Sequence, residues 1–206
     1  MATLNLQWAN NSYVLRSRLA PSQMPQTAEV GESITNCVYN AKMGDFGQTP
    51  TKKAVLKLAK GLDAVKLLEH EYSLYTCELF SLQGIAIPMC YGLYKGEIDG
   101  VTSGCLILEK CVPMVDLKLD DRQFMINLCK IHAAGVAHNG LHKQNHIVQQ
   151  GLCPRIIDFS MAEVHRCPGC SPADRFGRVN KEVTPCPELA TLERIYGMKS
   201  GDPAGS

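Results

Sequence analysis

Ala54-Val55-Leu56-Lys57 is a short β-prone run that ends in a lysine. Side chains alternate between the two faces of a strand, so Lys57 is expected to point away from the core face, toward a cleft. A lysine in such a place needs an anionic partner. Glu71 in the following segment is the first candidate for that partner, and Glu69 is the alternative.

A helix is predicted to begin at Leu62, because apolar residues recur there at steps of three and four residues. The apolar stripe is Leu62, Val65, Leu68, Tyr72, Tyr75 and Leu79. Glu71 lies beside this stripe, as an ion pair between the helix and the strand of Lys57 requires. Gly84 and Pro88 are expected to end the helix.

Further elements are predicted on both sides of this helix. Strands are expected over 30–42 and 54–59 before it, and over 89–94 and 105–108 after it. A second helix is expected from about 121, a short β pair around 147 and 156–157, and a last helix over 188–196 with Pro187 in its first turn. Residues 1–27 are predicted to form an irregular arm and 200–206 a loose tail.

Two later segments follow the 54–57 run: His138-Asn139-Gly140-Leu141-His142-Lys143-Gln144-Asn145 and Asp158-Phe159-Ser160. In order and spacing the three segments match the protein-kinase signatures V-A-I-K, H-R-D-L-x-x-x-N and D-F-G. The chain therefore resembles a compact protein kinase-like domain, with the register held from residue 30 to residue 160. In length it resembles the short kinase-like proteins of fungi.

This resemblance implies a fold class and a division of the chain. The fold would be α+β, a protein kinase-like two-lobed fold. A small β-rich N-lobe would occupy 28–111, and a truncated helical C-lobe would occupy 112–199.

The resemblance also implies a site for ATP and Mg²⁺. Lys57 and Glu71 would form the catalytic ion pair, and Asn145 and Asp158 would bind Mg²⁺ through oxygen donors. The residues in contact with the nucleotide would be Gly31, Val38, Val55, Lys57, Leu108, Glu109 and Cys111. Ser33 and Asn36 replace two glycines of the phosphate-binding loop, which weakens its grip on the phosphates.

One position departs from the kinase pattern. Gly140 stands where the catalytic aspartate is expected, and glycine cannot accept the proton of a substrate hydroxyl. We therefore predict a catalytically impaired pseudokinase that binds ATP and Mg²⁺ weakly or not at all and acts through contacts with an unidentified protein partner. The alternative is an active atypical kinase that transfers phosphate from ATP to a protein or small molecule, with His142 as the base.

A separate cluster has the residue types of a zinc site: His165-Arg166-Cys167-Pro168-Gly169-Cys170, with Cys186 beyond it. His165, Cys167, Cys170 and Cys186 could supply four tetrahedral ligands and staple a loop that has little core of its own. This pattern supports a third hypothesis, a zinc-stabilised interaction module. The simpler interpretation is an irregular loop with free cysteines.

The composition narrows the range of partners. The net charge is +1, with 21 basic and 20 acidic residues, so no strong field favours nucleic acid or a membrane surface. The ten cysteines show no disulfide framework, and the N-terminus shows no signal peptide. We therefore expect a cytoplasmic, intracellular protein without a nucleic-acid or membrane partner.

Overall fold

The computed structural model describes residues 1–17, 25–114, 121–141, 146–169 and 186–196. They belong to two compact units, which are described one at a time. The first unit contains Met1–Thr76 and Met89–Lys110, and the second contains Cys77–Pro88 and Cys111–Ser206. The described residues are mostly β, with three short α-helices.

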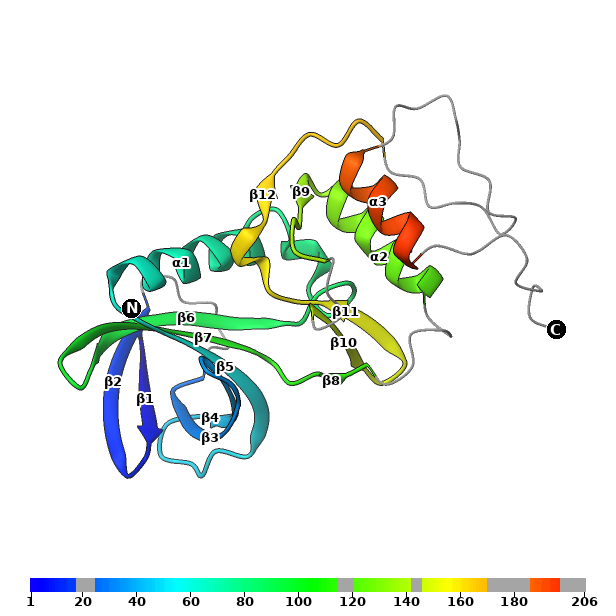
Figure 1. Ribbon diagram of the computed structural model, residues 1–206. Helices are drawn as coiled ribbons and strands as arrows, with labels where there is room; N and C mark the ends of the chain where they lie inside the picture. The colour runs from blue at the N-terminus through cyan, green and yellow to red at the C-terminus, as the bar shows by residue number, and fades with distance from the viewer. Residues whose placement is uncertain (18–24, 115–120, 142–145, 170–185, 197–206) are drawn as a thin grey trace. The chain divides into compact units, whose positions relative to one another are not determined.

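The first unit is a closed barrel of seven strands with one helix (Figure 1). The order around the barrel is β1-β2-β6-β7-β5-β4-β3, and the parallel pairing of β1 with β3 closes it. The strands are β1 (Ala2–Trp8), β2 (Asn11–Ser17), β3 (Thr27–Thr35), β4 (Val38–Gly44), β5 (Lys52–Lys60), β6 (Cys90–Ile98) and β7 (Val101–Glu109). The helix α1 (Leu62–Thr76) packs on β5, β6 and β7.

The barrel encloses an apolar core that follows from the period-two pattern of its strands. Leu4, Leu6, Leu15, Leu56 and Ile107 are all fully buried in it. The polar end of the buried Tyr94 is also satisfied, because its hydroxyl donates a 2.6 Å hydrogen bond to the carbonyl of Pro25. Closure of the barrel therefore buries apolar side chains from every part of the first unit.

The second unit contains two helices and several very short strands. Its elements are η1 (Phe80–Leu82), β8 (Val112–Pro113), α2 (Asp121–Ala133), β9 (Val136–Ala137), β10 (Ile147–Gln150), β11 (Cys153–Ile156), η3 (Phe159–Met161), β12 (Glu163–Val164) and α3 (Pro187–Tyr196). The strands form two small sheets, in the orders β11-β10-β8 and β12-β9. Figure 1 shows α2 and α3 side by side, and the rings of Phe124 and Tyr196 meet between them at 4.7 Å.

The α+β, protein kinase-like two-lobed fold expected from the sequence is wrong. The described chain is mostly β, with the seven-stranded barrel and three short helices. The irregular arm predicted over 1–27 is also wrong, because this region supplies β1 and β2 of the barrel. Leu4, Leu6 and Leu15 alternate there with polar residues, and their burial requires a partner sheet that no local pattern reveals.

Other local predictions are confirmed in part. The first helix ends at Thr76 instead of at Gly84 and Pro88, and the strand expected over 30–42 is divided between β3 and β4. The helices begin at Leu62 and Asp121, and the third has Pro187 at its first position. The β pair predicted around 147 and 156–157 is present as β10 and β11. The predicted tail over 200–206 lies outside the described residues.

Candidate metal centre

Four potential metal ligands meet in the second unit: His132, His165, Cys167 and Cys186. One ligand atom of each lies within 4.8 Å of the corresponding atoms of the other three. His132 is in the last turn of α2, His165 and Cys167 follow β12, and Cys186 directly precedes α3. The cluster therefore joins three separate segments of the chain.

The turn after α2 places the two histidines together. Gly135 ends the helix with a φ of 86°, a conformation that costs glycine little, and its N–H donates to the carbonyl of His132 over 3.0 Å. The carbonyl of Gly135 then accepts a 2.7 Å hydrogen bond from the N–H of His165. The rings of His132 and His165 consequently lie edge to face, with centroids 5.3 Å apart.

The start of α3 places Cys186. Its carbonyl accepts the first hydrogen bond of the helix, from the N–H of Ala190 over 2.8 Å, while Pro187 takes the first helical position. Cys186 is therefore the N-cap residue of α3, and its thiol faces the two histidines.

The spacing of the cluster suits a tetrahedral metal. The sulfur of Cys186 lies 3.6 Å from Nδ1 of His132 and 3.6 Å from Nε2 of His165. A tetrahedral Zn²⁺ with bonds of about 2.05 Å to nitrogen and 2.3 Å to sulfur separates those two ligand atoms by about 3.6 Å. Cys167 and Cys186 are thiols that form no disulfide with each other, so both sulfurs are available as ligands.

The cluster is shielded on one side and open on the other. His132 is 1% exposed and Cys186 2% exposed, whereas His165 and Cys167 are half-buried. His132, His165 and Cys167 also line a surface pocket of about 420 Å³, together with Glu78. A metal ion therefore has a path to the ligands from solvent.

A carboxylate lies directly behind His132. Oε2 of Glu188, in the first turn of α3, is 3.0 Å from Nε2 of His132. Burial acts to raise the pKa of Glu188, but the contacts with His132, Asn139 and His138 outweigh it, so the pKa is lowered from its ordinary value. Glu188 is accordingly a carboxylate at neutral pH.

The sequence predicted three of these four ligands. His165, Cys167 and Cys186 are together as expected, while Cys170 lies outside the described residues. His132 was missed, because a single histidine in the last turn of an amphipathic helix has an ordinary role there as a helix-capping cation. Only the fold brings this helix end next to His165.

The predicted partner of Lys57 is confirmed in the first unit. Nζ of Lys57 lies 2.6 Å from Oε2 of Glu71, with side chains 17% and 1% exposed. Glu69, the alternative, instead forms an exposed ion pair with Lys95. The apolar stripe of α1 explains the difference, because Glu71 is buried with it while Glu69 faces solvent.

Three other predicted nucleotide contacts share a strand face with Lys57. The register places Val38 opposite Lys57 and Val55 opposite Leu108. This face is opposite to the one that carries Leu56 and Ile107 into the barrel core. The remaining predictions are scattered: Gly31 is in β3, Glu109 accepts a 3.1 Å hydrogen bond from the N–H of Met89, and Cys111 is buried in the second unit.

The predicted magnesium ligands and base are only partly described. Asp158 has a φ of 68°, accepts a 2.8 Å hydrogen bond from Ser160 and lies 3.5 Å from Nε2 of His146. Asn145 and His142 lie outside the described residues. A side chain at position 140 would be in close contact with two histidines, since a Cβ there would lie 3.2 Å from Nδ1 of His138 and 3.3 Å from Nδ1 of His146.

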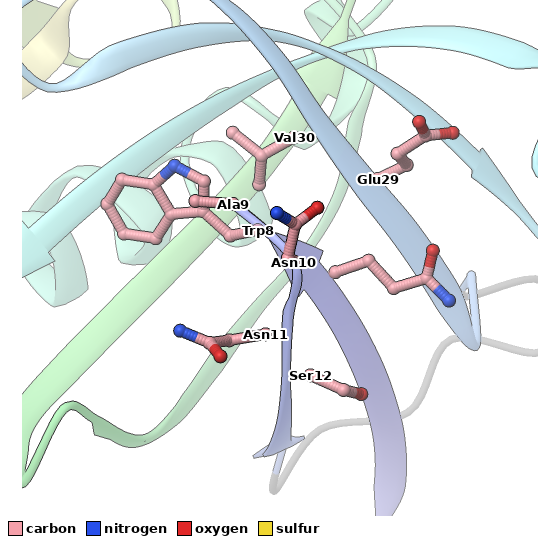
Figure 2. A pocket seen from close by; sticks show the side chains of 8 residues that line it. Trp8, Ala9, Asn10, Asn11, Ser12, Glu29 and Val30 are labelled. Atoms are coloured by element: carbon pink, nitrogen blue, oxygen red, sulfur yellow. The ribbon is translucent and has the colours of Figure 1, made fainter.

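The first unit also has a polar pocket of about 370 Å³ at the β1–β2 hairpin. Figure 2 shows it lined by Trp8, Asn10, Asn11, Glu29 and others. The ring of Trp8 is already engaged, by the edge of Tyr39 at 5.4 Å and by the ammonium of Lys60 at 4.9 Å.

Comparison with models of known protein families and with curated proteins finds no match. The resemblance to protein kinases therefore stays a prediction. Among the described residues, every helix is too short or too polar to cross a membrane.

The Lys57–Glu71 pair gives a test of the first unit. Removing the charge of Glu71 in Glu71→Gln leaves the half-buried ammonium of Lys57 without the carboxylate 2.6 Å away, and should lower the free energy of unfolding by roughly 3 kcal/mol. Glu69→Gln, on the same helix, should cost less than about 1 kcal/mol because its pair is exposed. Urea unfolding followed by circular dichroism measures both. Equal losses for the two variants would contradict the buried pair.

Proposed function

We propose that this chain is a zinc-stabilised binding module, in which one structural Zn²⁺ joins His132, His165, Cys167 and Cys186. The observation that carries the proposal is the 3.6 Å separation of the Cys186 sulfur from one nitrogen of each histidine. A single thiol proton can be shared with only one of those nitrogens. One cation at the centre satisfies both nitrogens and both sulfurs at once.

The donor set favours zinc over other divalent metals. Two thiolates and two imidazoles are soft and borderline ligands, which Mg²⁺ and Ca²⁺ avoid and which Zn²⁺ binds in tetrahedral geometry. All four positions would be filled by the protein. A closed set of this kind leaves no place for an activated water, so it supports a structural rather than a catalytic metal.

The position of the cluster explains what the metal would stabilise. The four ligands come from the end of α2, the exit of β12 and the start of α3. β9 and β12 have two residues each, so their pairing contributes few hydrogen bonds. Metal binding would add its own free energy to folding where these three segments meet.

Metal analysis of the purified protein tests this proposal. The wild type should carry about one equivalent of zinc, and Cys186→Ser and His132→Asn should each lose most of it because a closed site tolerates no missing ligand. Chelation of the zinc should also lower Tm. Cys153→Ser is the matched control, since Cys153 is an exposed thiol of β11 in the same unit.

Two results would contradict the zinc proposal. One is a wild type that holds well below one equivalent after it has been supplied with zinc. The other is retention of zinc by Cys186→Ser at the level of the Cys153→Ser control.

The Lys57–Glu71 pair favours a second candidate function, nucleotide binding without phosphoryl transfer. Lys57 is a cation held in place at 2.6 Å by Glu71, and Val38, Val55 and Leu108 offer an apolar surface on the same strand face. Fixed cations of this kind bind phosphate groups. Glycine at position 140 has no side chain that could act as a base, so this candidate binds nucleotide without transferring phosphate.

Thermal shift with ATP and Mg²⁺ tests the second candidate. Nucleotide at about 100 times its Kd should add about 2.7 kcal/mol to the wild type. Lys57→Met should abolish the shift, and Lys95→Met should retain it because Lys95 pairs with Glu69 on the exposed surface. An unchanged Tm of the wild type at millimolar nucleotide would contradict nucleotide binding. Transfer of labelled phosphate would contradict the absence of catalysis.

A further inference from the structure

Glu188 makes three short contacts from the first turn of α3, two residues after Cys186. Its Oε2 lies 3.0 Å from Nε2 of His132 and accepts a 2.9 Å hydrogen bond from the N–H of His138. Its Oε1 accepts a 2.7 Å hydrogen bond from the N–H of Asn139. One side chain thus contacts both the cluster and the loop formed by residues 138–140.

The first of these contacts favours one orientation and one tautomer of the His132 ring. A carboxylate beside Nε2 favours the tautomer with its proton on Nε2, which leaves the lone pair of Nδ1 directed toward the sulfur of Cys186. The opposite tautomer would direct a lone pair at the carboxylate and a proton at the metal. The side chain of His132 has no exposure to water with Glu188 in place.

The other two contacts bind the loop at a left-handed turn. Asn139 has a φ of 61°, in the left-handed region that asparagine adopts more readily than most residues with a side chain. Its side chain donates to the carbonyl of Met161 over 3.3 Å, while both N–H groups of the turn point at Glu188. Loss of the carboxylate would leave the part-buried N–H of His138 without its acceptor and would remove the acceptor of the exposed N–H of Asn139.

The loop also contacts residues 157 and 159, on either side of Asp158. Nε2 of His138 lies 3.0 Å from the carbonyl of Ile157, and its Nδ1 accepts a 3.2 Å hydrogen bond from the N–H of Gly140. The ring of His138 also lies against Phe159, with centroids 4.9 Å apart. His138 therefore links the turn held by Glu188 to residues 157–161.

We infer that Glu188 is a positioning residue for the metal ligand His132, and that through Glu188 occupancy of the metal centre orders the loop 138–140. The inference rests on the proposed zinc function. Bound zinc would hold the ring of His132, the ring would hold the carboxylate of Glu188 at 3.0 Å, and the carboxylate would hold the N–H groups of His138 and Asn139. Because such coupling is reciprocal, an ordered loop also favours zinc binding.

Zinc affinity, measured by chelator competition on the full chain, tests the positioning role. Glu188→Gln should weaken zinc binding by about 10- to 100-fold. Its amide group replaces one of the two carboxylate oxygens that contact His132, His138 and Asn139 with an NH₂ donor. Glu193→Gln, on the same helix α3 and away from the cluster, should leave affinity within about threefold. Equal affinities for the wild type and Glu188→Gln overturn the positioning role.

Amide hydrogen exchange on the wild type, with and without zinc, tests the coupling without any variant. The amides of His138 and Asn139 should lose protection when zinc is removed, whereas the amide of Ile156, which donates a 2.8 Å hydrogen bond to the carbonyl of Ala86 in the same unit, should keep more of its protection. In zinc-loaded Glu188→Gln the same two amides should be unprotected. Such selectivity separates positioning from a general loss of stability.

Two further outcomes separate this inference from the zinc proposal. Protection of His138 and Asn139 that does not depend on zinc overturns the coupling, while the zinc proposal stands. A wild type that binds no zinc overturns the zinc proposal, and the coupling with it.

Discussion

In the proposed zinc module, the meeting of two imidazoles and two thiols is the constraint on which the second unit depends. Its strands have only two to four residues each, too few to form stable sheets on their own. The helices α2 and α3 touch through Phe124 and Tyr196, and the residues directly after β12 are described up to 169 with no helix or strand. The proposed zinc ion would tie this segment to both helices through a few strong bonds.

Three consecutive residues at the start of α3 contact or position parts of the cluster. Cys186 caps the helix and supplies a ligand, Pro187 fixes the first helical position, and Glu188 reaches both His132 and the turn at His138. The N-terminus of a helix carries partial positive charge, which favours the negative charge of a thiolate and of a carboxylate. The same helix end can therefore stabilise the metal ligand and its supporting carboxylate. The barrel of the first unit needs no such device, because its strands are longer and close on themselves.

Local elements could be predicted from the sequence, and their assembly could not. The apolar stripe of α1 and the proline at the start of α3 can be recognised within single segments. The partner of Lys57 could also be predicted, because the stripe buries the helix face that carries Glu71 and leaves Glu69 more exposed. The closed barrel depends on parallel pairing of β1 with β3, between residues 22 positions apart, which no local pattern specifies. His132 was missed for the same reason, because its neighbours His165 and Cys186 are distant in the sequence.

X-ray absorption at the zinc edge of the zinc-loaded protein tests the central claim most directly, because it reports the ligand atoms themselves. A site made by His132, His165, Cys167 and Cys186 predicts two nitrogen ligands at about 2.0–2.1 Å and two sulfur ligands at about 2.3 Å. The sulfur contribution should fall to one in Cys186→Ser wherever zinc is retained. A spectrum of nitrogen and oxygen ligands alone, or of six-coordinate zinc, would contradict the metal centre.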